Sequence, residues 1–213
     1  MDTQTKIIKT KNKKVIMPTI NSSTIKVQKR DGRQEPLDIN KIHFVVEEAC
    51  EGLPGVSSSQ IEMNANIQFY DGMTTKDIQN VLVRSANDLI SLEAPNYQYA
   101  AARLLSYDVR KEAHGQYEYI PLLKLVLRNI RLGVYDKNIV EKYTTSDIKR
   151  FNTWIRRDRD LNFTYAGLRQ IVDKYLVQDR STGQLYETPQ DMYMMIAATL
   201  FADYPTKTRM TYV

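Results

Sequence analysis

Apolar residues recur at helical spacing along most of this chain, and that periodicity most constrains its fold. One such series predicts a helix with a single buried face, formed by Ile39, Ile42, Val46, Ala49 and Leu53. A series near the end predicts another, burying Met192, Met195, Ile196 and Leu200. We therefore expect a mainly α fold, with six further helices around residues 57–69, 74–89, 95–113, 122–130, 148–155 and 168–175.

Two short stretches break the helical pattern and predict β-hairpins. In the first, Ile25 and Val27 alternate with polar neighbours, and Asp31-Gly32 is a strong turn signal. In the second, "YLVQDRSTGQLYE" (175–187) surrounds a turn that contains Gly183. The expected fold is thus a small hairpin with a four-helix unit, followed by a helical region with one further hairpin.

Capping residues mark where several helices should begin. Asp38 is placed to cap the helix that follows the first hairpin. Ser57 and Gln60 match a capping box, and Thr188 with Asp191 matches another. Thr74 precedes the third helix in the same way. These positions divide the chain into short helices joined by tight connections.

The positive charge of the chain is concentrated at its start. Residues 1–26 carry six lysines and one acid, which account for the whole formal net charge of +5. The rest is neutral, which argues against a nucleic-acid-binding body. We expect residues 1–24 to form a flexible basic extension. No apolar stretch suits an export signal or a membrane span, so we expect a cytoplasmic protein that does not contact membranes.

The sequence offers no catalytic or metal-binding constellation. Cys50 is the only cysteine and lies on the predicted apolar face of the first helix, where we interpret it as a small hydrophobic residue. No Walker loop, GxSxG or HExxH motif is present. The densest charge run, "RRDRD" (156–160), is typical of a solvated helix end.

Basic residues gather on the first hairpin and the helix after it, in "VQKRDGRQEPLDINKI" (27–42). If the hairpin folds back on that helix, Lys29 and Arg30 approach Lys41, and Arg110-Lys111 could join them. Converging cations near a helix start suit a polyphosphate. The same residues on an ordinary charged surface would need no ligand, so the residue types alone leave both interpretations open.

Several separated motifs resemble one family. "VQKRDGRQEPLDINKI" is followed by "IQFYDGMTTKDI", "DLISLEAPNYQYAAARL" and "VRKEAHGQYE", in an order similar to the ATP-cone of class I ribonucleotide reductase large subunits. "DRDLNFTYAGLRQIVDKYLVQDRSTGQLYETPQ" and "AATLFADYPTKTR" resemble the helical region before that family's ten-stranded α/β barrel. The resemblance implies an ATP-cone over residues 25–115 and the helical N-terminal region over 116–213.

The resemblance also implies a nucleotide site. The family's cone binds ATP as activator and dATP as inhibitor, with or without Mg²⁺. By matching positions, the phosphate side would involve Lys29, Arg30, Lys41 and Lys111. The nucleoside side would involve Val27, Glu35, Asp38, Ile42 and Thr75, with Gln79 near the sugar. Gln79 stands where bacterial relatives often carry histidine, and Asp38 where asparagine is common.

The family's chemistry requires several cysteines that this chain lacks, so no catalytic residue is assigned and the chain alone is expected to be inactive. The ending "TRMTYV" has no helix stop, so we expect the polypeptide to continue, as a split-gene product or a truncated subunit. The implied partners are the catalytic portion of the large subunit, the radical-generating small (beta) subunit and further copies of the chain.

Two other functions remain open from the sequence. One is a stand-alone nucleotide-sensing regulator that carries an ATP-cone, such as a transcription repressor, although such proteins have a cysteine-rich zinc ribbon that is missing here. The other is a degenerate cone that serves only as an assembly scaffold. The departures from the family's usual residues at Asp38 and Gln79 favour this alternative.

Overall fold

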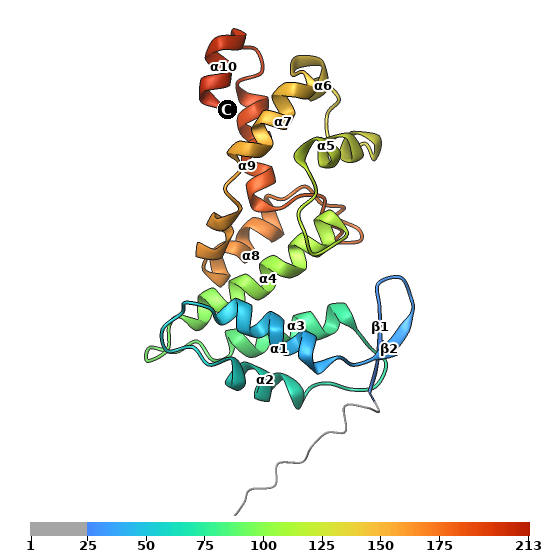
Figure 1. Cartoon of the computed structure of the whole chain (residues 1–213), viewed down its shortest axis with the longest axis vertical. Coiled ribbons are helices and arrows are strands. Elements are labelled where there is room, and N and C mark those ends of the chain that lie inside the picture. Colours follow the sequence, from blue (N-terminus) through green and yellow to red (C-terminus); the bar gives the residue numbers. More distant parts are fainter. Residues whose placement is uncertain (1–24) are drawn as a thin grey trace, which may run out of the picture.

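The computed structural model describes residues 25–213, and the predicted basic extension over residues 1–24 lies outside them. The mainly α fold class is confirmed: helices dominate, beside one small sheet (Figure 1). The first elements are β1 (Lys26–Gln28), β2 (Gln34–Pro36), α1 (Ile39–Cys50), α2 (Ser58–Asn66), β3 (Met73–Thr74), α3 (Thr75–Asn87) and α4 (Tyr97–His114). The later elements are α5 (Leu122–Arg131), α6 (Asn138–Lys142), α7 (Thr145–Trp154), the 3-10 helix η1 (Arg157–Asn162), α8 (Tyr165–Lys174), α9 (Pro189–Leu200) and α10 (Thr206–Tyr212).

The predicted first hairpin is confirmed and belongs to a slightly larger sheet. β1 pairs antiparallel with β2, with Val27 opposite Glu35. The turn between them contains Gly32 at φ +84°, a conformation that favours glycine. On its other side β1 pairs parallel with β3, with Val27 opposite Met73. This third strand is only two residues long and was not predicted.

The long helix α4 connects the two halves of the molecule. It contacts α1 and α3 on one side and α8 and η1 on the other, and in Figure 1 it lies between the α1–α3 layer and α8. Its alanine-rich middle is fully buried, which lets neighbouring helices approach closely. Gly115 ends the helix at φ +74°, as expected from the sequence.

Two hydrophobic cores hold the chain together. The first joins β1, α1–α4 and part of the later chain, because Leu168 and Val172 of α8 pack into it together with Leu176, Leu185 and Met192. The second joins α5, α6, α7 and α9 around Leu125 and Phe151. The division of the chain after residue 115 stays a prediction, and the first core extends across that point.

Two predicted helix faces are partly wrong. Ile39 begins α1 but leaves 40% of its surface exposed, while Ile42, Val46 and Ala49 are buried as predicted. On α9, Ile196 and Leu200 are 48% and 68% exposed, and the buried positions after its first turn are Met192, Met194 and Ala198. α9 is apolar around most of its circumference, so periodicity could not identify its inner face.

The predicted helix caps are mostly confirmed. Asp38 accepts from the backbone amides of Asn40 and Lys41, and Thr74 accepts from that of Asp77. Thr188 and Asp191 form the predicted capping box. Ser57 and Gln60 do not form theirs. The Ser57 amide donates instead to the Tyr97 hydroxyl, which donates at 2.6 Å to Gln60, so a side chain from α4 replaces the local cap.

The second hairpin is present in reduced form. A single antiparallel bridge joins Gln178 to Leu185, and the turn between them holds Gly183 at φ +75°. The short helices α6 and α10 were not predicted. Within residues 25–213, no helix is long and apolar enough to cross a membrane.

Candidate functional site

A cleft of about 120 Å³ lies where the first hairpin meets α1, α3 and the end of α4. The hairpin lines it together with the first two turns of α1 and α3, and α4 contributes one side chain. The lining residues are Val27, Lys29, Glu35, Pro36, Leu37, Asp38, Lys41, Ile42, Val45, Thr75, Ile78, Gln79, Leu82 and Lys111.

The structure brings together nine of the ten predicted site residues in this cleft. They are Val27, Lys29, Glu35, Asp38, Lys41, Ile42, Thr75, Gln79 and Lys111. They come from β1, β2, α1, α3, α4 and adjoining residues up to 84 positions apart, so the fold and not local sequence assembles them. Arg30 is the predicted residue that does not line the cleft.

The inner surface of the cleft is apolar. Val27, Ile42 and Ile78 are each less than 9% exposed, and Leu82 lies beneath them at 1%. Such a surface can pack against the flat apolar face of a base, while polar groups around it fix the orientation of the ligand. The volume is below the ~300 Å³ at which small-molecule sites usually begin. A nucleotide in this cleft would therefore keep much of its surface open to solvent.

Gln79 is held firmly beside the cleft. Its side chain is 7% exposed, and its amide nitrogen donates to the Leu104 carbonyl at 2.8 Å. With the nitrogen engaged by α4, the remaining polar atom of this side chain is the carbonyl oxygen, which can accept from a hydroxyl or amino group. Gln79 therefore offers the cleft an oriented acceptor.

The cations of the hairpin and α1 are paired with carboxylates in the cleft itself. Lys29 Nζ lies 2.5 Å from Glu35, and Lys41 Nζ lies 3.4 Å from Asp38. The hydrogen bond from Lys29 lowers the pKa of Glu35, and the Lys41 backbone amide lowers the pKa of Asp38. Both carboxylates are thus ionised near neutral pH and balance the two lysines.

Lys111 projects from the end of α4 and has no carboxylate within 4.0 Å among the described residues. Burial lowers its pKa, and the nearby Arg30 lowers it further, while Asp108 partly compensates. A partly buried ammonium near another cation gains most from a bound anion. Lys111 is therefore the cleft residue whose charged form a bound anion would stabilise most.

Arg110 does not join this group, so that part of the prediction is wrong. Its guanidinium lies 4.1 Å from the ring centroid of Tyr117 and 4.9 Å from that of Tyr119, and neither tyrosine lines the cleft. Adjacent residues on a helix point about 100° apart, which explains why Lys111 reaches the cleft and Arg110 cannot.

The interpretation of "RRDRD" as a solvated helix end is also wrong for two of its five residues. Arg157 Nη2 donates to Asp191 at 2.6 Å, and Asp160 is 2% exposed and accepts from Gln190 at 3.0 Å. The remaining three residues are at least partly solvated, and Arg156 pairs locally with Asp158. Partners more than 25 positions away on α9 decide which members are buried.

Cys50 agrees with its interpretation as a small hydrophobic residue. It is half-buried at the end of α1 and packs against the first core. Burial raises the pKa of its thiol to about 11, which keeps it protonated and unreactive near neutral pH. No group of three or more His, Cys, Asp or Glu side chains in residues 25–213 is arranged to hold a metal ion.

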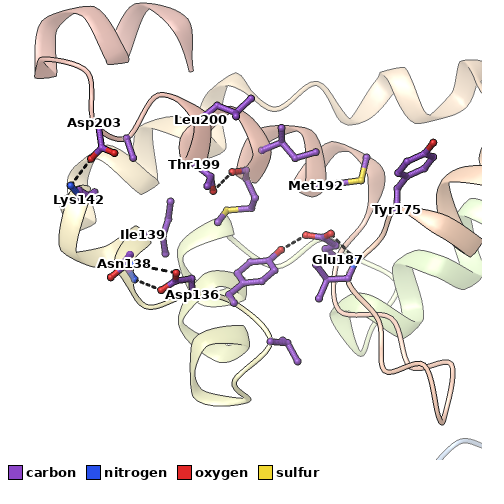
Figure 2. A pocket seen from close by; sticks show the side chains of 16 residues that line it. Asp136, Asn138, Ile139, Lys142, Tyr175, Glu187, Met192, Thr199, Leu200 and Asp203 are labelled. Carbon is purple, nitrogen blue, oxygen red and sulfur yellow. Dashed lines mark hydrogen bonds and ion pairs between the residues drawn. The ribbon is translucent and has the colours of Figure 1, made fainter.

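A larger cavity of about 600 Å³ lies at the other end of the molecule, between α9 and the segment around α6 (Figure 2). Its polar groups already have partners: Glu187 accepts from Tyr135 and from the Val177 amide, and Lys142 pairs with Asp203. The rest is mostly apolar, with methionines and leucine along α9. This cavity offers none of the converging cations of the first cleft.

Comparison with protein families assigns both parts of the chain. The model of the ATP cone domain matches residues 25–112, and the model of the ribonucleotide reductase all-alpha domain matches residues 161–213. The chain belongs to the ribonucleotide reductase large-subunit family. The predicted resemblance is thereby confirmed, and the cleft lies entirely within the residues matched by the ATP cone model.

Individual reductase relatives agree with this assignment. The chain is 46% identical over 192 residues to ribonucleoside-diphosphate reductase 1 subunit alpha of Salmonella typhimurium, a match that covers 90% of the chain. It is 47% identical over 187 residues, 88% of the chain, to the subunit of the same name from Escherichia coli. The reductase alpha subunit of phage T4 is 40% identical over 85% of the chain. The chain spans about a quarter of the length of these relatives.

Proposed function

We propose that the cleft is an allosteric site that binds ATP as activator and dATP as inhibitor of a ribonucleoside-diphosphate reductase. The observation that carries this proposal is the assembly of cations, oriented acceptors and an apolar surface in one cleft of an ATP cone. Lys29, Lys41 and Lys111 would contact the phosphates, and any Mg²⁺ would arrive with them. The apolar surface would carry the base.

The acceptors give the site a means to select its nucleotide. Gln79, fixed through its nitrogen, would accept from the sugar, where ATP and dATP differ by one hydroxyl. Glu35 and Asp38 also line the cleft and would accept from the amino group of the base or from the sugar. A buried acceptor that loses its donor costs about 1–3 kcal/mol, enough to separate two such ligands.

The chemistry of the reductase would reside in portions absent from this chain. We propose that a catalytic portion of the large subunit, the small (beta) subunit and further copies of the chain are its partners in a soluble complex. The relatives named as alpha subunits and the matched all-alpha domain support this assembly. The chain would then report the nucleotide state to the complex and would not itself reduce substrate.

Calorimetric titration of variants tests the proposal. Lys111→Ala should weaken ATP and dATP binding at least tenfold, because a lost charged contact to phosphate costs about 1.5–3 kcal/mol. Lys149→Ala on α7 removes the same charge from an exposed position outside the cleft and should leave both affinities unchanged. Equal effects of the two variants would reduce the cleft to an ordinary charged surface, and the scaffold interpretation would replace this one.

A further inference from the structure

Arg30 does not line the cleft and is held by a carboxylate of α4. Its Nη2 donates to Asp108 Oδ1 at 2.8 Å, across 78 positions of sequence. The Asp108 side chain is 12% exposed, whereas the Arg30 side chain is 42% exposed. A largely buried acceptor therefore anchors a guanidinium that sits at the solvent-facing turn of the hairpin.

The pair lies directly beside the phosphate side of the proposed site. Asp108 precedes Lys111 by one helical turn, and Arg30 follows Lys29 on the hairpin. Lys76 and Glu112 complete the local charges, paired with each other at 3.1 Å. Asp108 is thus the carboxylate that pairs with Arg30 and also attracts the nearby Lys111.

We propose that Asp108 is a latch that competes with nucleotide phosphate for Arg30 and so sets the affinity of the cleft. This inference rests on the proposed nucleotide site and names a specificity-determining residue that the site itself does not include. A phosphate entering the cleft meets a guanidinium already bound to an anion of similar geometry. Binding must release Arg30 from Asp108 or proceed without it, and it must tolerate the nearby carboxylate.

The latch makes affinity depend on the number of phosphate charges. A triphosphate carries more negative charge than one carboxylate and can displace it from Arg30. A monophosphate carries less charge than a triphosphate and competes less well. Nucleosides without phosphate would not engage Arg30 at all. The latch would therefore favour nucleoside triphosphates over their partly hydrolysed forms, with Asp108 as the residue that imposes the preference.

Isosteric neutralisation of Asp108 tests the latch. Asp108→Asn keeps the side-chain shape but removes the charge that holds Arg30, so the intact chain should bind ATP about fivefold tighter or better, with a smaller gain for AMP and none for adenosine. Asp88→Asn removes the same charge at the far end of α3, about 20 Å from Thr75 by helical rise, and should change little. Unchanged or weaker ATP binding by Asp108→Asn would overturn the latch, because it would mean that Asp108 is neutral or that it orients Arg30.

A double variant separates release of Arg30 from simple loss of negative charge. In an Arg30→Ala background, Asp108→Asn should give a clearly smaller gain than in the wild-type background. An equal gain in both backgrounds would contradict competition for Arg30. Inorganic tripolyphosphate serves as a probe that does not depend on the nucleotide assignment. If Asp108→Asn increases the affinity for tripolyphosphate and the chain shows no preference for ATP over it, the latch is supported and the nucleotide function is refuted. Absence of binding of either probe by all variants refutes both.

Discussion

Arg157 of η1 binds Asp191 in the first turn of α9, with 2.6 Å between Nη2 and Oδ1. The same guanidinium donates to Thr188 at 3.0 Å and lies 4.3 Å from the ring centroid of Tyr119. Asp191 is fully buried, and His114 at the end of α4 lies 3.2 Å from its other oxygen. One carboxylate therefore joins the last turn of α4 to the first turn of α9.

Removal of Arg157 should destabilise the protein strongly. Arg157→Ala would leave Asp191 buried without its arginine partner, and loss of one partner of a buried pair costs about 3 kcal/mol or more. Arg156→Ala, one position away, breaks only an exposed pair with Asp158 and should cost less than about 0.5 kcal/mol. Urea unfolding measures both free energies, and similar values for the two variants would contradict the assigned role of Arg157.

The pH dependence of stability should reveal Asp160. Burial raises its pKa to about 6, against the hydrogen bond from Gln190, so the folded state binds this proton more tightly than the unfolded state does. A raised acid pKa makes the free energy of unfolding fall as pH rises from about 4 through 6. Asp160→Asn has no titrating carboxyl at this position, so its free energy of unfolding does not fall in this way. The difference between the variant and the wild type should grow by roughly 2 kcal/mol in favour of the variant from pH 4 to pH 7.

The comparison with Asp160→Asn separates the effect of Asp160 on the pH dependence of stability from the opposite effect of Asp191. Burial alone would raise the pKa of Asp191, but His114 and Arg157 outweigh it and hold the pKa below its usual range. Its contribution is therefore present above about pH 4 and is lost in acid, in both proteins alike. A difference between the two unfolding curves that stays constant from pH 4 to pH 7 would show that Asp160 keeps an ordinary pKa.

Asp38 serves both a helix cap and the cleft, and two substitutions separate these roles. Asp38→Ala removes the acceptor for the amides of Asn40 and Lys41 and should cost about 1 kcal/mol of folding free energy. Asp38→Asn keeps an acceptor of equal capping strength and should stay within about 0.5 kcal/mol of the wild type. If thermal or urea unfolding finds the two variants equally unstable, the charge and not the cap carries the contribution.

Gln79 should control the difference between ATP and dATP. Gln79→Met keeps the length of the side chain but removes the acceptor, so the ratio of the two dissociation constants should move toward one, by about fivefold. Both dissociation constants are measured on the same variant, so a loss of affinity common to ATP and dATP cancels in their ratio. A ratio equal to that of the wild type would exclude Gln79 from recognition of the sugar.

Local features of the sequence predicted the parts of the fold that depend on neighbouring residues. Asp31-Gly32 determined the hairpin turn, and Asp38 determined the start of α1, because both act within a few positions. β3 was missed because it pairs with β1 across more than 40 positions of sequence. The pairing consists of only two residue pairs. A pattern of that length carries no periodicity.

Long-range partners also explain where the site prediction stopped. Family motifs identified residues that the cleft brings together, but they could not show that Asp108 holds Arg30 outside it. In the same way, "RRDRD" gave no sign that Arg157 would bind Asp191, 34 positions later. In both cases a buried carboxylate elsewhere in the chain determines the position of an arginine.

Amide hydrogen exchange with and without ATP tests the central claim most directly, because it distinguishes a ligand in the cleft from one in the larger cavity beside α9. ATP in the cleft should slow exchange in β1, β2 and the first turns of α1 and α3, and leave the α9 segment of Figure 2 unchanged. Protection confined to residues 134–142 and 192–203, around the larger cavity, would contradict the account. So would a lack of protection anywhere at millimolar ATP.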